Sequence, residues 1–192
     1  MNDDGVNDDG PTLEELMPVG GSWRGLLFEN ASAGHTLALT WTFTIDFEEI
    51  AREYGSVAPN LVVDWVPLTP TSWRSVSGHE IECDRFGQPI ETSFYFFEHH
   101  RYDNVSLSTG NQSGGKLIVS IRASGDLDGL GLAAVTFDGE LDFDGIIVQT
   151  ESSGTDTDAA VDLLARFTDT AGLSAAPTGH NVIFTLDRQS GG

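Results

Sequence analysis

Residues 36–46 alternate strictly between large apolar and small side chains, with a period of two residues. One face carries leucine, tryptophan, phenylalanine and isoleucine, and the other carries mostly threonine. A period of two predicts a half-buried strand of an antiparallel sheet. The same alternation recurs in 60–66, 91–102, 116–123, 131–137, 139–150 and 180–188, and more weakly in 22–29, 72–77 and 79–83. The pattern therefore indicates a mainly β protein.

Turn-forming residues separate these segments. They are Asp103-Asn104, the glycine-rich stretches 110–115 and 125–129, and Asp138-Gly139, a dipeptide typical of tight hairpins. We therefore predict an up-and-down meander of five strands between residues 91 and 150. Such a meander hides the unpaired edges of its outer strands most simply by closing into a barrel.

Two segments follow a helical period instead. In 46–55, Asp46 and Glu49 have the spacing of a capping box, and the apolar residues share one helical side. In 157–171, four apolar residues repeat at helical spacing before Gly172. We therefore expect an antiparallel up-and-down barrel of about nine or ten strands with two short helices. Another antiparallel barrel or an α+β sheet stays open as the alternative.

The length of 192 residues fits one domain. Residues 1–11 contain four aspartates and almost nothing to bury, so we expect a disordered acidic tail before a single domain over 12–190. Thr12 and Glu15 have the spacing of a capping box for a helical turn at its start. The single cysteine, Cys83, excludes an internal disulfide framework. No apolar run approaches the ~18 residues of a membrane span, and no apolar-cored leader opens the chain. We therefore expect a cytoplasmic protein without a membrane partner.

Thirty acidic and nine basic residues give the chain a net charge of −21. Binding to nucleic-acid phosphates depends on clustered lysine and arginine, so we exclude a nucleic-acid partner. The acidic residues are spread along both halves of the chain, and Lys116 is its one lysine. This composition resembles that of proteins from salt-loving organisms, in which salt screens self-repulsion, and we favour that interpretation. The alternative is an acidic surface for a basic protein partner.

The segment Gly21-Ser22-Trp23-Arg24-Gly25 follows the predicted helical turn and opens a strand. This arrangement resembles the start of calycin-type barrels, the lipocalin-like and nitrobindin-like proteins, in which a helical turn precedes a strand marked G-x-W. The resemblance implies that Trp23 plugs the closed end of a barrel and that an arginine of the last strand packs across its ring. Arg188 lies on the apolar face of the last predicted strand, where a guanidinium can stack on an indole.

The aromatic stretch 91–102 contains the residues that we expect to bind a ligand. Adjacent strand residues point to opposite faces, so His99 and His100 cannot hold one metal ion together. Polar side-chain tips in an apolar cavity are typical of a binding site. The alternative is a histidine that is hydrogen-bonded in the core. If the even-numbered face is inward, the cavity wall consists of Phe94, Phe96, His100 and Tyr102.

His180 begins the last predicted strand, on its apolar face. The resemblance implies a haem cofactor for nitrobindin-like barrels, held by a histidine near the end of the chain, and His180 has that position here. A neutral imidazole on an apolar wall is a suitable axial ligand. The alternative is a strand-end histidine that contacts solvent.

We predict no catalytic residues and no metal site. The cluster from His79 to Cys83 contains metal-binding residue types, but no second cluster follows at ligand spacing. The sequence has neither a G-x-S-x-G nucleophile motif nor a cysteine–histidine pair with supporting context. These observations favour a binding protein over an enzyme.

Our first functional hypothesis is a barrel that binds a small apolar or amphipathic molecule in its interior. The first alternative is the same barrel with haem on His180 and a redox or isomerase activity. The second alternative is an acidic protein-interaction module without a ligand. A filled barrel interior would favour this last alternative.

Overall fold

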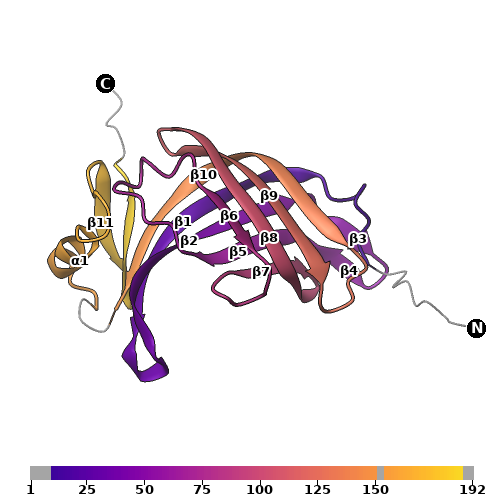
Figure 1. Cartoon of the computed structure of the whole chain (residues 1–192), viewed down its shortest axis with the longest axis horizontal. Coiled ribbons are helices and arrows are strands. Elements are labelled where there is room, and N and C mark those ends of the chain that lie inside the picture. Colours follow the sequence, from indigo (N-terminus) through magenta and orange to yellow (C-terminus); the bar gives the residue numbers. More distant parts are fainter. Residues whose placement is uncertain (1–9, 151–153, 188–192) are drawn as a thin grey trace, which may run out of the picture.

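The computed structural model describes residues 10–150 and 154–187 and consists mainly of β-strands (Figure 1). Seven strands form a closed barrel, and the last of them pairs with the first. The prediction that the sheet closes into a barrel is confirmed. The barrel strands in order are β1 (Pro18–Asn30), β2 (His35–Phe47), β5 (Asn60–Val66), β7 (Glu91–Phe96), β8 (Glu98–Ser113), β9 (Lys116–Asp126) and β10 (Ala134–Gln149).

The seam between β1 and β10 is parallel, which corrects the prediction of a purely antiparallel barrel. All other neighbouring strands around the barrel are antiparallel. Because strand direction alternates around the barrel, an odd number of strands brings the first and the last together in the same direction. A barrel of seven strands, where nine or ten strands were predicted, therefore requires the parallel seam.

Residues 91–102 form two strands instead of the predicted one. Phe97 alone separates β7 from β8, and its backbone lies in the left-handed region with a φ of 58°. The chain reverses direction at this residue, so that His100 of β8 pairs with Phe94 of β7. This pairing places even-numbered residues opposite one another, so the predicted inward face is shared by both strands.

Two predicted turns lie inside strands. Asp103-Asn104 is part of β8, and Asp138-Gly139 is part of β10, so the meander from residue 91 to 150 has four strands and not five. Gly139 fits a strand because the ring of Phe137 occupies the space that a side chain at position 139 would fill. Backbone pairing with β9 continues past Gly139 without interruption.

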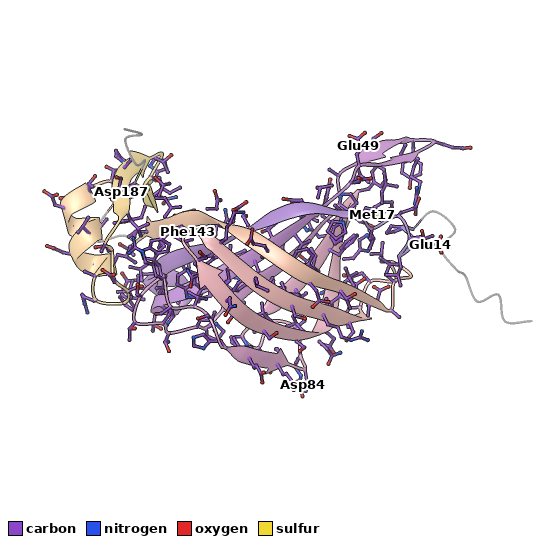
Figure 2. The ribbon with its side chains drawn as sticks, turned by 90° about the horizontal axis from the view of Figure 1, so that it is seen from above. Glu14, Met17, Glu49, Asp84, Phe143 and Asp187 are labelled. Carbon is purple, nitrogen blue, oxygen red and sulfur yellow. The ribbon has the colours of Figure 1, made fainter. Side chains whose placement is uncertain are left out.

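The helix predicted over 46–55 is wrong. The segment instead contributes to a two-stranded hairpin of β3 (Ile50–Arg52) and β4 (Gly55–Val57). Ile50 and Val57 pair across this hairpin, and both are buried. The apolar spacing of the segment suits burial in either form, so tertiary packing decides between them. The hairpin lies at one end of the barrel, the end at which Figure 2 shows Met17 and Glu49.

The segment before β1 keeps its predicted capping contact. The backbone N–H of Thr12 donates to the Glu15 carboxylate over 2.8 Å, although residues 12–17 form turns and not a helix. Most of the predicted acidic tail, residues 1–9, lies outside the described residues. Pro11 is buried.

A smaller unit covers the other end of the barrel (Figure 1). It consists of the helix α1 (Thr157–Leu164) and a hairpin of β11 (Leu173–Thr178) and β12 (Asn181–Leu186). The helix is shorter than the predicted 157–171, and Asp156 is its N-cap, with a carboxylate that accepts two backbone N–H groups. β12 confirms the predicted last strand and pairs with β10 beyond the stretch that β9 occupies.

Three remaining segments lie along the side of the barrel or at its margin. β6 (Glu80–Cys83) confirms the strand predicted over 79–83 and pairs with β8. The strand predicted over 72–77 is wrong, because this segment is a loop that buries Trp73. A short 3-10 helix, η1 (Ala31–Ala33), caps the long β1–β2 hairpin.

Large side chains fill the interior of the barrel. Trp23, Trp41, Phe43, Phe94 and Tyr102 are fully buried and belong to one hydrophobic cluster. The period-two alternation directs these side chains inward from neighbouring strands. The interior is therefore a packed core that holds the sheet closed by burial of apolar surface.

Candidate functional site

The four residues predicted to line a cavity lie together on the inward face of β7 and β8. Phe94 and Tyr102 are fully buried in the core. The Tyr102 hydroxyl donates to the Leu132 carbonyl over 3.1 Å, and burial raises its pKa. Phe96 and His100 instead line a cavity at the β3–β4 end of the barrel. The pairing of the strands thus separates the predicted set into two core residues and two cavity residues.

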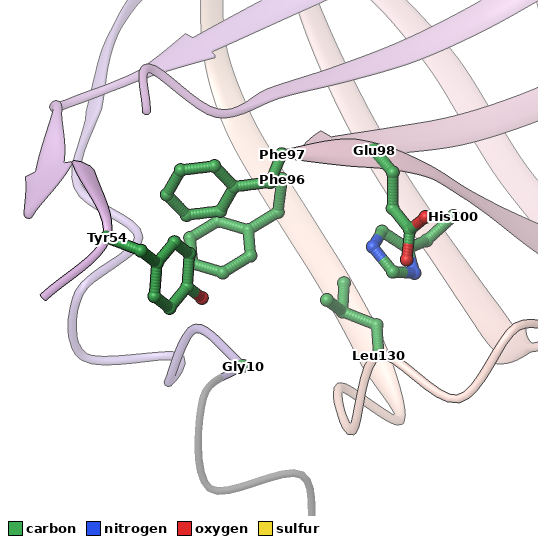
Figure 3. A pocket seen from close by; sticks show the side chains of 7 residues that line it. All are labelled: Gly10, Tyr54, Phe96, Phe97, Glu98, His100 and Leu130. Carbon is green, nitrogen blue, oxygen red and sulfur yellow. The ribbon is translucent and has the colours of Figure 1, made fainter. Parts of the chain in front are cut away.

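The cavity at this end, here called the mouth cavity, has a volume of about 310 Å³. Figure 3 shows aromatic rings gathered on one side of it and a carboxylate, an imidazole and a leucine toward the other. Sequence reasoning missed Tyr54 and Phe97, because the first lies in the wrongly predicted helix and the second in an unrecognised turn. The lining residues are Gly10, Tyr54, Phe96, Phe97, Glu98, His100 and Leu130.

Three aromatic rings form the apolar wall of the mouth cavity. The Tyr54 and Phe97 ring centroids lie 4.8 Å apart at an interplanar angle of 54°, and those of Phe96 and Phe97 lie 5.0 Å apart at 80°. Tyr54 comes from the β3–β4 turn and is 60% exposed. The reversal at Phe97 is what brings its ring against Tyr54. The wall therefore combines one exposed ring with two rings anchored at the barrel rim.

His100 is the polar group most deeply placed in this cavity. Its side chain is only 6% exposed. Its Nδ1 atom is buried and has no hydrogen-bond partner among the residues that the structure describes. An unsatisfied buried polar atom costs about 1–3 kcal/mol. One residue of the cavity lining therefore carries a buried polar atom without a partner among the described residues.

The arginines near the mouth cavity are engaged by carboxylates. Both terminal nitrogens of Arg52 bond to Glu15, over 2.8 and 2.9 Å, and its guanidinium lies 5.4 Å from the centre of the Phe96 ring. The hydrogen bonds from Arg52 lower the pKa of Glu15 to about 2. Arg101 likewise makes a two-point contact with Asp128 and lowers the pKa of that carboxyl.

Trp23 lies toward the opposite end of the barrel from the mouth cavity. It is fully buried, and its indole N–H donates to the Gly115 carbonyl over 3.3 Å. Its ring lies 4.7 Å from Phe143, which in turn stacks on Trp73. The role of Trp23 in closing that end stays a prediction.

The predicted partner of Trp23, Arg188, lies outside the described residues. A stacked cation is nevertheless present in the same aromatic cluster. The Arg74 guanidinium lies 4.3 Å from the centre of the Trp73 ring. The sequence does not indicate this pair, because the alternation in 72–77 predicts a strand and not a loop.

His180 lies in the turn between β11 and β12 and is exposed. A porphyrin needs an apolar pocket around its axial ligand. The exposed turn offers no such wall among the described residues, so the residues present do not fit a haem. No group of three or more histidine, cysteine, aspartate or glutamate residues in the described ranges could hold a metal ion.

A second hollow, here called the outer groove, lies outside the barrel beside the β1–β2 hairpin. Its volume is about 630 Å³. The Trp65 ring stacks on His35 at 6.3 Å and meets Phe28 edge-on at 5.8 Å. This groove contains no buried polar atom without a partner in the described part of the chain. The mouth cavity is therefore the better candidate for a specific site.

No protein-family model matches the chain, and no curated protein or solved structure is significantly similar to it. The closed barrel is compatible with a calycin-like fold, while membership of that family is not shown. Within the described ranges, no helix has the length and apolar character needed to cross a bilayer.

Proposed function

We propose that this barrel is a binding protein for a small amphipathic molecule, which it holds in the mouth cavity. The observation that carries the proposal is the buried and unpartnered Nδ1 of His100 beside an aromatic wall. A ligand that bonds to this nitrogen removes the cost of leaving it unsatisfied. The rings supply apolar contact to the rest of the ligand.

The size and position of the cavity favour a compact ligand at the barrel rim. Its volume of about 310 Å³ is at the lower end of the ~300–1,000 Å³ typical of small-molecule sites. The interior beneath it is filled by fully buried side chains, Phe94 and Tyr102 among them. Because the interior is packed, we place the proposed site at the mouth of the barrel and not in its interior. Phe96 and His100 line this site.

A filled interior also favours a second candidate function, an acidic protein-interaction module. Its support is the net charge of −21, which attracts basic surfaces over long range. Binding of a basic partner would weaken steeply as ionic strength rises. Binding of a neutral small molecule in the mouth cavity would not.

Fluorescence titration with the neutral apolar probe N-phenyl-1-naphthylamine tests the proposed function. We expect saturable binding that Tyr54→Ala weakens about 5- to 10-fold, because one aromatic contact is worth about 1 kcal/mol. Tyr95→Ala is the matched control, since Tyr95 lies on β7 but packs on His99 and not in the cavity. Absence of saturable binding, or an equal loss in both variants, would overturn the proposal.

A further inference from the structure

We infer that the ligand of the mouth cavity is an organic ammonium ion, a compact amine with an apolar body. This inference rests on the proposed function and names the chemical class of its ligand. Three observations carry it: the orientation of the aromatic rings, the charge at the cavity wall and the free nitrogen of His100.

The aromatic rings present faces and edges in several directions. Tyr54 is tilted by 54° and Phe96 by 80° relative to Phe97. The face of an aromatic ring is electron-rich and attracts cations, and groups of such rings recognise ammonium ions. The same wall already holds one cation, because the Arg52 guanidinium lies over Phe96 at 5.4 Å. Tyr54, which is 60% exposed, leaves ring surface open to a second cation.

The wall of the mouth cavity carries a negative charge, which attracts a cation. Glu98 lines the cavity, and its carboxylate forms no ion pair within the described part of the chain. Arg52 and Arg101, in contrast, are each bonded to a carboxylate through two nitrogens. An anionic ligand would meet Glu98 without a compensating charge. The net charge of −21 further raises the local concentration of cations around the molecule.

His100 narrows the class of cation. In a neutral imidazole one nitrogen donates a hydrogen bond and the other accepts one. Nδ1 is buried and has no partner among the described residues, and we assign it the role of acceptor. An ammonium ion that carries at least one N–H can donate to it, whereas a quaternary ammonium ion cannot. The cavity of about 310 Å³ limits the ligand to a compact molecule. The preferred ligand is therefore a primary to tertiary amine of that size.

Isothermal titration calorimetry with four compounds that share a phenylethyl body tests this inference. They are 2-phenylethylammonium, the neutral 2-phenylethanol, the anionic 3-phenylpropanoate and the quaternary trimethyl(2-phenylethyl)ammonium. We expect the primary ammonium ion to bind at least ten-fold more tightly than the alcohol and more tightly than the quaternary ion. The anion should bind most weakly.

The role of Glu98 is tested with Glu98→Gln, which keeps the size of the side chain and removes its charge. This variant should weaken binding of the ammonium ion about ten-fold and leave the alcohol unchanged. Glu80→Gln is the matched control, because Glu80 lies on β6, is exposed and does not line the cavity. It should leave the affinities for both compounds unchanged.

The outcomes separate this inference from the proposed function. Equal affinity for the ammonium ion and the alcohol, or no effect of Glu98→Gln, would overturn the inference, while Tyr54-dependent binding of the neutral probe would leave the proposed function standing. Equal affinity for the primary and quaternary ions would overturn the part assigned to His100. If neither the four compounds nor the neutral probe bind, both the inference and the proposed function fail.

Discussion

Phe97 and His100 each hold an unfavourable state beside the mouth cavity. Phe97 has a φ of 58°, in a region that costs a bulky residue about 1–3 kcal/mol. His100 keeps a buried nitrogen without a hydrogen bond, at a similar cost. Packing of the barrel must offset both costs. Their coincidence in one cavity is what we expect where a protein keeps groups available for a ligand and not for its own stability.

Glu15 and Arg52 tie the segment before β1 to the β3–β4 hairpin, so their ion pair should make stability depend on pH. The pKa of Glu15 is lowered to about 2 in the folded protein from an ordinary value of 4.5. The ion pair therefore stabilises the fold fully above about pH 4.5, and this contribution disappears as the pH falls toward 2. Its size is modest, because the Glu15 side chain is 35% exposed and solvent screens the pair.

Urea unfolding of the wild type and of Glu15→Gln checks this expectation. The variant should be less stable near neutral pH, and the difference between the two proteins should shrink as the pH is lowered from about 5 to 3. Glu14→Gln, at the exposed neighbouring position, should show no such convergence. A difference that stays constant over this range would contradict the assignment.

At the scale of elements, β10 pairs both with barrel strands and with β12 of the smaller unit, and a glycine of β10 lies against β12. Gly145 has a φ of 109°, and a side chain there would overlap the carbonyl oxygen of Phe184 on β12. Gly145 also lies at the register shift between β1 and β10. The attachment of the β11–β12 hairpin therefore depends on this position, which lies beside the seam of the barrel.

Gly145→Ala should detach the hairpin while the barrel stays closed. Amide hydrogen exchange in β12 at Val182 and Phe184 should become at least ten-fold faster, and exchange in β2 should change little. Gly129→Ala serves as the control, because Gly129 also has a positive φ but has open space around it. Equal exchange rates in the two variants would show that the overlap with β12 does not matter.

The strand pattern, the inward faces and the glycine-rich reversals at 110–115 and 125–129 could be predicted from the sequence, but the reversal at Phe97 and the hairpin in 46–55 could not. Strict alternation located most strands of the barrel, and it placed Phe96 and His100 on the buried face. Phe97 shows no turn signal, because a left-handed phenylalanine is stabilised only by its tertiary contacts. The apolar spacing in 46–55 suits a helix and a buried hairpin equally. Tyr54 and Phe97, two rings of the candidate site, were missed for these two reasons.

For the whole molecule, the net charge of −21 is the dominant property. The described ion pairs join a few carboxylates to arginine or lysine, and most acidic groups have no such partner there. Repulsion among them opposes the compact state, and salt screens repulsion over distances that shrink to a few ångströms near 1 M. The folded barrel should therefore be stabilised by salt.

Thermal unfolding in sodium chloride from about 0.1 to 2 M measures this effect. We expect the midpoint temperature to rise by several degrees, with most of the gain at the lower concentrations, where screening changes most. The gain should become much smaller near the isoelectric point, where repulsion is weak. A midpoint that is independent of salt at neutral pH would contradict the electrostatic explanation.

We propose that the mouth cavity, and not the interior or the outer groove, receives a small molecule. Amide chemical-shift mapping of ¹⁵N-labelled protein during titration with N-phenyl-1-naphthylamine distinguishes these three sites. The largest shifts should occur at Tyr54, Phe97, Glu98, His100 and Leu130 and should saturate together. Largest shifts along the outer groove at Phe28, His35 and Trp65, or a titration that shifts no amide, would contradict this proposal.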